Sequence, residues 1–186
     1  MKPPIIITGC HRSGTTIAAH ILGQELGCAV IDDLQFMPDK EHFDKLRVMI
    51  DNDITKFIVL CHSALQIPVH IFHVFPELHW VGITRKKEDI INSMKRIHWC
   101  KNDVTNWHQF LNDHVNHTRQ SWGVAKSILP KENWTELKYE SLKKHPLFIP
   151  KEQRENFTVK QWKLNEPCGM KYWENNYECY MEKMNG

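Results

Sequence analysis

The 186-residue sequence lacks the features that mark several large classes of protein. It contains no apolar run long enough to span a membrane and no signal peptide, so we expect a cytoplasmic protein without a membrane span. The formal net charge is only +2, and Lys and Arg are scattered among acids, which argues against a nucleic-acid binder. Internal repeats and low-complexity segments are also lacking, which favours one globular domain over residues 1–186.

The cysteines do not form any C-x-x-C pair, which argues against a redox or zinc motif. A chain of this length can bury a hydrophobic core without disulfides. We therefore expect reduced thiols at the six positions, which are Cys10, Cys28, Cys61, Cys100, Cys168 and Cys179.

Apolar runs of strand length alternate with helical patterns along most of the chain. Strands are expected at 4–8, 28–31, 57–60, 79–84 and 133–139. Helices are expected at 14–26, from about 43 to 51, and at 63–75, 88–99 and 103–129. The alternation favours an α/β fold of three layers, with a central, mostly parallel sheet and helices on both faces. Residues 148–186 are rich in aromatics and are expected to form a C-terminal cap.

A glycine-containing loop follows the first apolar run, residues 5–7, and leads into a helical pattern. In this arrangement, backbone N–H groups and the helix N-terminus converge on a phosphate. The spacing of Gly9 and Gly14 matches a Walker A loop, but Thr15 stands where a nucleotide triphosphatase has Lys. Arg12 supplies the fixed positive charge of the loop. We therefore expect a phosphate-binding loop that is not built for ordinary ATP chemistry.

Residues 12–16, Arg-Ser-Gly-Thr-Thr, resemble the phosphosulfate loop of the sulfotransferases, which is roughly (Lys/Arg)-Ser-Gly-Thr-Thr. Those enzymes use 3′-phosphoadenosine 5′-phosphosulfate (PAPS) as the sulfuryl donor. The resemblance implies that Arg12 contacts the 5′-phosphate and the sulfuryl group, and so takes part in catalysis. It implies that the donor is bound by His11, Arg12, Ser13, Gly14, Thr15 and Thr16.

A second motif begins at Arg85, at the end of the strand expected at 79–84, and ends at Ser93 on the following helix. Sulfotransferases carry an Arg at the end of this strand and a Ser eight positions later, and both bind the 3′-phosphate of the donor. An arginine offers two parallel donors and a serine adds a hydroxyl. Taken singly, Arg85 is more typical of a surface ion pair and Ser93 of a solvated helix position.

A third motif, Tyr-Glu-x-Leu, begins at Tyr139 and is followed by Pro146. In sulfotransferases the Tyr of this motif lies near the adenine of the donor, whereas the motif alone is more typical of a core tyrosine at a strand end. The motifs occur in the order of the family, and the resemblance covers residues 4–147. The Arg-Lys-Gly-rich C-terminal loop of cytosolic sulfotransferases has no counterpart, and Lys171 or Lys163 is the nearest basic candidate for the 3′-phosphate.

Two residues are candidates for the base that removes the proton of the acceptor. His62 directly follows the strand at 57–60, where cytosolic sulfotransferases have a catalytic His, although the family's preceding Lys is missing. Glu41 is the alternative, because residues 39–43 resemble the loop that carries the catalytic Glu in heparan and some bacterial sulfotransferases. Asp32 or Asp33 remains a third possibility.

Three functions are compatible with these motifs. The resemblance implies a PAPS-dependent sulfotransferase of a soluble type, which releases 3′,5′-diphosphoadenosine (PAP) and needs no metal. A small-molecule kinase is the second, since the Asp32-Asp33 pair offers acids for Mg²⁺. A non-catalytic nucleotide-binding relative is the third. The acceptor, whether a small molecule, a glycan or a peptide, stays open at this point, as does the oligomeric state.

In parallel sheets, ligands bind beyond the carboxyl ends of the strands. The glycine loop, residues 9–16, and the side chains of His62, Arg85 and Tyr139 all follow expected strands. We therefore expect them to converge at one edge of the sheet.

Overall fold

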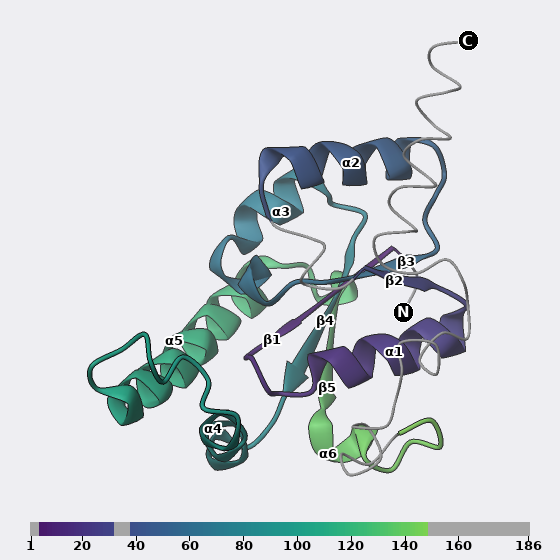
Figure 1. The fold of residues 1–186 in the computed structure, drawn as a ribbon. Helices are drawn as coiled ribbons and strands as arrows, with labels where there is room; N and C mark the ends of the chain where they lie inside the picture. Colours follow the sequence, from purple (N-terminus) through teal and green to yellow (C-terminus); the bar gives the residue numbers. More distant parts are fainter. Residues whose placement is uncertain (1–3, 32–37, 149–186) are drawn as a thin grey trace.

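A computed structural model describes residues 4–31 and 38–148. The elements are β1 (Ile5–Gly9), α1 (Thr15–Leu26), β2 (Ala29–Ile31), α2 (Lys40–Asp51), β3 (Phe57–Leu60), η1 (His62–Gln66), α3 (Pro68–Val74), β4 (His79–Thr84), α4 (Lys87–Arg96), α5 (Trp107–Ile128), η2 (Lys131–Asn133), β5 (Trp134–Lys138) and α6 (Tyr139–Leu142). The expected alternation of strands and helices is confirmed (Figure 1). Among these residues, no helix combines the length and apolar character needed to cross a membrane.

The five strands form one sheet in which every pairing is parallel, in the order β2-β3-β1-β4-β5. Its central strand is β1, where Ile6 pairs with Val59 of β3 on one side and with Trp80 of β4 on the other. The chain builds β2 and β3 on one side of β1 and then β4 and β5 on the other. Helix α1, which follows β1, packs on one face of the sheet, and α3, which follows β3, packs on the other, so the carboxyl ends of these adjacent strands form a switch point of the kind where open α/β sheets bind ligands.

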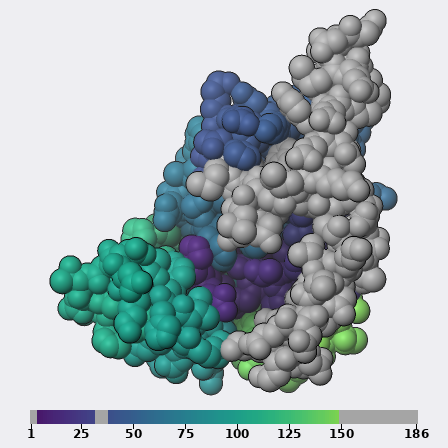
Figure 2. Space-filling view, in the orientation of Figure 1, coloured from purple at the N-terminus to yellow at the C-terminus, as the bar shows by residue number. Residues whose placement is uncertain are grey.

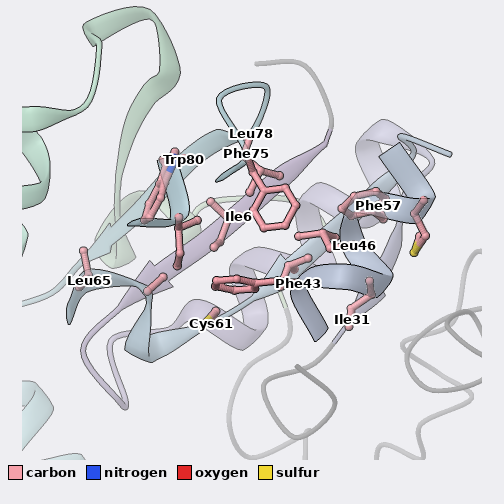
Figure 3. Close-up of a cluster of buried hydrophobic side chains, with 14 of the residues drawn as sticks. Ile6, Ile31, Phe43, Leu46, Phe57, Cys61, Leu65, Phe75, Leu78 and Trp80 are labelled. Carbon is pink, nitrogen blue, oxygen red and sulfur yellow. The ribbon is translucent and has the colours of Figure 1, made fainter. Parts of the chain in front are cut away.

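The sheet is buried on both faces, as expected for parallel strands. Because side chains alternate along a strand, Ile6 packs into one core while Ile5 and Ile7 pack into the other. The first core joins the sheet to α2, α3 and α5 through fully buried side chains such as Phe57 and Trp80 (Figure 3). The second core joins it to α1 and α6. In Figure 1, α2 and α3 accordingly lie above the sheet and α1 below it.

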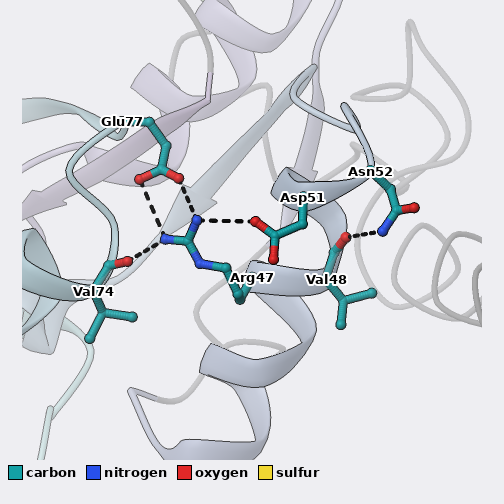
Figure 4. Close-up of polar contacts among 6 residues, drawn as sticks. All are labelled: Arg47, Val48, Asp51, Asn52, Val74 and Glu77. Carbon is teal, nitrogen blue, oxygen red and sulfur yellow. Dashed lines mark hydrogen bonds and ion pairs between the residues drawn. The ribbon is translucent and has the colours of Figure 1, made fainter.

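An ion-pair network fixes α2 to the turn that follows α3 (Figure 4). The guanidinium of Arg47 donates to Glu77 at 2.6 Å, to Asp51 at 3.3 Å and to the backbone carbonyl of Val74. The hydrogen bond to Glu77 is the main reason that the pKa of Arg47 is raised. Because the pair is about a third exposed, its contribution to stability is on the order of 1 kcal/mol or less.

Two helix boundaries in the first half of the chain differ from those expected. Helix α2 begins at Lys40, because the side chain of Asp39 accepts a hydrogen bond from the backbone N–H of His42 at 3.0 Å and caps the helix. The segment expected as one helix at 63–75 is divided into η1 and α3. Pro68 has no N–H to donate and therefore begins α3 instead of continuing a longer helix.

Helix boundaries in the second half are also displaced. Helix α4 ends at Arg96, and His98 and Cys100 then adopt positive φ angles of 51° and 53° that no α-helix contains. Helix α5 begins at Trp107, because the side chain of Asn106 accepts from the N–H of Gln109 at 3.4 Å. Strand β5 ends at Lys138, one residue earlier than expected. The cap expected at 148–186 lies, apart from its first residue, outside the described residues.

Candidate active site

The glycine loop, residues 9–16, connects the central strand β1 to α1. Gly9 and Gly14 have φ angles of 156° and 104°, and a Cβ at Gly14 would lie 2.4 Å from the ring of Tyr139. Arg12 also has a positive φ, 69°, which is uncommon for a residue with a side chain. Such conformations cost on the order of 1–3 kcal/mol and concentrate at functional sites. The loop is therefore held tightly against its surroundings and needs glycine at position 14.

The first two sequence motifs meet at Ser93. Arg12 donates its Nε–H to the hydroxyl oxygen of Ser93 at 3.4 Å, and Arg96 donates to the same oxygen at 3.3 Å. Arg85 donates to the backbone carbonyl of Arg12 at 3.0 Å. Two guanidinium groups thus contact the hydroxyl of the buried Ser93 and a third contacts the backbone of the loop, an arrangement suited to binding an anion.

The side chain of Tyr139 packs against the loop and against Arg85. Its ring is 8% exposed and packs against Gly14, and the guanidinium of Arg85 lies over it at 4.2 Å. The residue is the first of α6 and belongs to the core around α1, so the structure gives Tyr139 a packing role. The expected convergence of the loop with Arg85 and Tyr139 is confirmed.

Two buried polar atoms of the cluster have no hydrogen-bond partner among the described residues. They are Oγ of Ser13 in the loop and Nε of Arg85. Burying such a group unpaired costs about 1–3 kcal/mol, so native proteins rarely leave one without a partner. Phosphate oxygens are acceptors for both a hydroxyl and a guanidinium, so these residues fit a phosphorylated ligand. Thr15 is buried and Thr16 is exposed on the first turn of α1, whose N-terminus favours the same kind of ligand.

His62 lies on the other side of the loop, at the start of η1. Its Nδ1 is 2.9 Å from the carbonyl oxygen of Gly9, and because a carbonyl only accepts, we assign the ring hydrogen to Nδ1. In the neutral ring, Nε2 is then the basic nitrogen, and it lies 3.4 Å from the hydroxyl oxygen of Thr15. The ring of His11 stacks on His62 with centroids 4.1 Å apart. The structure therefore brings a potential base to the loop.

Glu41 does not join this group. Residues 39–43, expected to form a loop, are instead the cap and first turn of α2, because Asp39 caps the helix. The side chain of Glu41 is exposed and forms an ion pair with Lys45 at 2.7 Å, and this hydrogen bond lowers the pKa of Glu41. In Figure 1, α2 and the loop after β1 lie in different parts of the molecule. The other candidates, Asp32, Asp33, Lys163 and Lys171, lie outside the described residues.

Two hollows adjoin the loop. The first opens to solvent and is lined by residues of the loop, η1 and α5, among them His11, His62 and His114. The second is also open, lies between the end of β4, the first turn of α4 and the middle of α5, and is lined by Arg85 and Arg119. In Figure 2 the purple N-terminal segment reaches the surface beside the teal atoms of α4 and α5.

Three residues near the loop were missed by the sequence analysis, namely Arg96, Trp99 and His114. The ring of His114 lies 5.5 Å from that of His11 and 4.7 Å from that of Trp99. Helical spacing predicts that His114 and Thr118 share a face of α5, but only the packing of α5 shows that this face meets the loop. Among the described residues, no three His, Cys, Asp or Glu side chains are grouped so as to hold a metal ion.

Comparison with known proteins shows which known fold this structure resembles. No protein-family model and no curated protein matches the sequence. The structure is similar to that of a sulfotransferase domain from the curacin biosynthetic pathway, with a TM-score of 0.58 and 14% identity over 91% of this chain and 81% of that domain. An uncharacterized protein from Eubacterium ventriosum has a TM-score of 0.39 and 12% identity over 72% and 88% of the two chains. The chain has a sulfotransferase-like fold.

Proposed function

We propose that the protein is a sulfotransferase, which transfers the sulfuryl group of PAPS to a hydroxyl or amine acceptor and releases PAP. The observation that carries the proposal is the meeting of two motifs: Arg12 of the loop donates to Ser93, and Arg85 donates to the carbonyl of Arg12. Arg12 lies more than seventy positions before Arg85 and Ser93 in the sequence, and an anionic ligand explains their grouping. The sulfotransferase-like fold supports the same function.

The residues of the loop bind one phosphate of a doubly phosphorylated donor, and Arg85 and α4 bind the other. Ser13, Thr15 and the N-terminus of α1 suit the 5′-phosphate, since they combine hydroxyls with unpaired backbone N–H groups. Arg85 and Ser93 suit the 3′-phosphate, as a guanidinium beside a hydroxyl. His11, Gly14, Thr16 and Tyr139 line or support the loop, and Lys171 remains a proposed additional cation.

Arg12 and His62 carry the chemistry in this proposal. When bound, the donor supplies an activated sulfuryl group whose transfer leaves negative charge on the departing phosphate. Arg12 stabilises that charge, an interaction that strengthens as the bond breaks. Nε2 of His62 takes the proton of the attacking hydroxyl or amine, because Nδ1 is held by the carbonyl of Gly9. Arg12 is exposed and His62 lines the first hollow, so both are within reach of ligands.

Thermal denaturation of the full chain with different nucleotides tests the proposal. PAP at about 100 times its dissociation constant should stabilise the protein by about 2.7 kcal/mol, which corresponds to a rise in Tm of roughly 5–10 °C for a chain of this size. Adenosine 5′-phosphate, which lacks the 3′-phosphate, should stabilise it less. Stabilisation by ATP with Mg²⁺ and not by PAP would instead indicate a kinase, and stabilisation by neither would indicate an interaction module.

Transfer itself is measured with labelled PAPS and a panel of small-molecule, glycan and peptide acceptors. We expect labelled product from at least one class. PAP binding without transfer to any class would leave a nucleotide-binding relative and overturn the assignment as an enzyme.

A further inference from the structure

The first hollow is lined mostly by residues with polar side chains. Apart from Leu65 and the backbone of Gly9, every residue that lines it carries a polar side chain. The imidazoles come from the loop, η1 and α5, and the hydroxyls and the amide come from η1 and α5. These lining residues are His11, His62, Ser63, Gln66, His114 and Ser121, together with His117 and Thr118.

His114 stands out within this lining. Its Nε2 atom is buried and has no hydrogen-bond partner among the described residues. Burial is the main cause that lowers the pKa of His114, and the neighbouring His117 and His62 lower it further. The ring is therefore neutral near pH 7, with one nitrogen that donates and one that accepts. A hydroxyl group can pair with either nitrogen.

Three aromatic rings pack against the ring of His114. Trp99 packs on it at 4.7 Å, His11 lies 5.5 Å away and Phe110 lies 6.3 Å away. Trp99 is itself fixed, because Nε1 of Trp107 donates to its carbonyl at 2.7 Å and both neighbours of Trp99 have positive φ angles. A half-buried ring that is held by such packing loses little entropy when a ligand binds it.

We propose that the acceptor carries two neighbouring hydroxyl groups, one presented to His62 and the other bound by His114. This proposal rests on the proposed sulfotransferase function. His62 and His114 both contact the ring of His11, so the two imidazoles face the same small space from the start of η1 and from α5. A diol, as found in sugars and catechols, pairs with both nitrogens.

A monohydric acceptor would bind less well for a definite reason. It would leave Nε2 of His114 unpaired, as it is in the free protein, whereas a diol would give this buried atom a partner, a difference of roughly tenfold to a hundredfold in affinity. Sites that hydrogen-bond a substrate hydroxyl reject analogues that lack it by this mechanism. Ser121 and Gln66 at the rim of the same hollow add further partners for a polyhydroxylated compound.

The test compares two pairs of probes that differ by one hydroxyl, catechol with phenol and cis-1,2-cyclohexanediol with cyclohexanol. Binding to the full chain is titrated by ligand-observed NMR, with and without PAP. In the wild type we expect each diol to bind roughly tenfold more tightly than its monohydric partner. His114→Phe keeps the ring but removes both nitrogens, so it should abolish this preference. His108→Phe, on an exposed position of the same helix, is the matched control and should retain it.

A second variant separates hydrogen bonding from packing. His114→Asn restores a donor and an acceptor, and we expect it to recover part of the preference that His114→Phe loses. The proposal is overturned if the wild type binds the two members of each pair equally, if it binds none of the four at millimolar concentration, or if His114→Phe keeps the preference. PAP-induced thermal stabilisation is scored separately. Stabilisation without diol preference refutes only the acceptor proposal, whereas diol preference without stabilisation refutes only the assignment of the donor.

Discussion

The two sides of the glycine loop differ sharply in charge. On the arginine side, Arg12 and Arg96 donate to the hydroxyl of Ser93, and Arg85 donates to the carbonyl of Arg12. On the histidine side, the rings of His62 and His114 both contact that of His11, and burial lowers the pKa of His114. Permanent charge suits the binding of phosphates, while imidazoles, which can accept a proton, suit a step in which a proton must leave a hydroxyl. One short loop thus separates two chemical environments.

The largest effect should come from the histidine side. His62→Ala removes the proposed base, and we expect transfer to fall by roughly 10³-fold, within the usual contribution of a general base. PAP binding should be nearly unchanged, because His62 lines the first hollow, whereas Arg85, which is proposed to bind the 3′-phosphate, lines the second. Glu41→Gln is the matched control and should retain the wild-type rate, since Glu41 pairs with Lys45 on the surface of α2. Full activity in His62→Ala, or loss of activity in Glu41→Gln, would reverse the assignment of the base.

Arg12→Ala tests the arginine side. Loss of a transition-state donor should lower kcat by roughly 10²-fold or more, while circular dichroism and Tm show an intact fold because the residue is exposed. Lys131→Ala, which removes an exposed cation far along the chain, controls for the change in net charge. If Arg12→Ala turned over at nearly the wild-type rate, the loop would have no part in the mechanism.

Arg85→Ala should act on donor affinity and not on the chemical step. We expect PAP to bind about 1.5–3 kcal/mol more weakly by isothermal titration, the range for a hydrogen bond to a charged group. The affinity for adenosine 5′-phosphate should fall much less. Lys86→Ala, which removes the neighbouring exposed cation, is the control. Equal losses for both nucleotides would mean that Arg85 mainly supports the loop through the carbonyl of Arg12 and the ring of Tyr139.

The smallest effect concerns stability in acid. Burial lowers the pKa of His114 in the folded protein below that of the unfolded chain, so protonation favours unfolding. The stabilisation is present above the unfolded-state value and is lost as the pH falls through the folded-state value. The decrease in Tm on acidification from pH 7 should therefore be smaller in His114→Phe than in the wild type or in His108→Phe. Equal decreases in the three proteins would show that His114 does not contribute to acid sensitivity.

Much of the fold could be predicted from local patterns. The strands predicted at 57–60 and 79–84 match β3 and β4. Strands of a parallel sheet are buried on both faces, so they appear in the sequence as short, nearly continuous apolar runs. Helix boundaries were less predictable, since they depend on single caps such as Asp39 and Asn106. The error at α2 mattered most, because it made Glu41 look like a loop residue near the site.

The sequence by itself determined the alternation of strands and helices, the glycine loop and the positions of Arg12, Arg85 and Ser93 within their elements. These features depend on periodicity and spacing over a few residues, and neighbouring side chains determine such local preferences. Only the tertiary structure decided that Arg12 reaches Ser93, that Tyr139 packs under Gly14, and that His114 faces the same hollow as His62. Those contacts join residues dozens of positions apart, and they depend on the order of strands in the sheet and on how α4 and α5 pack across its edge.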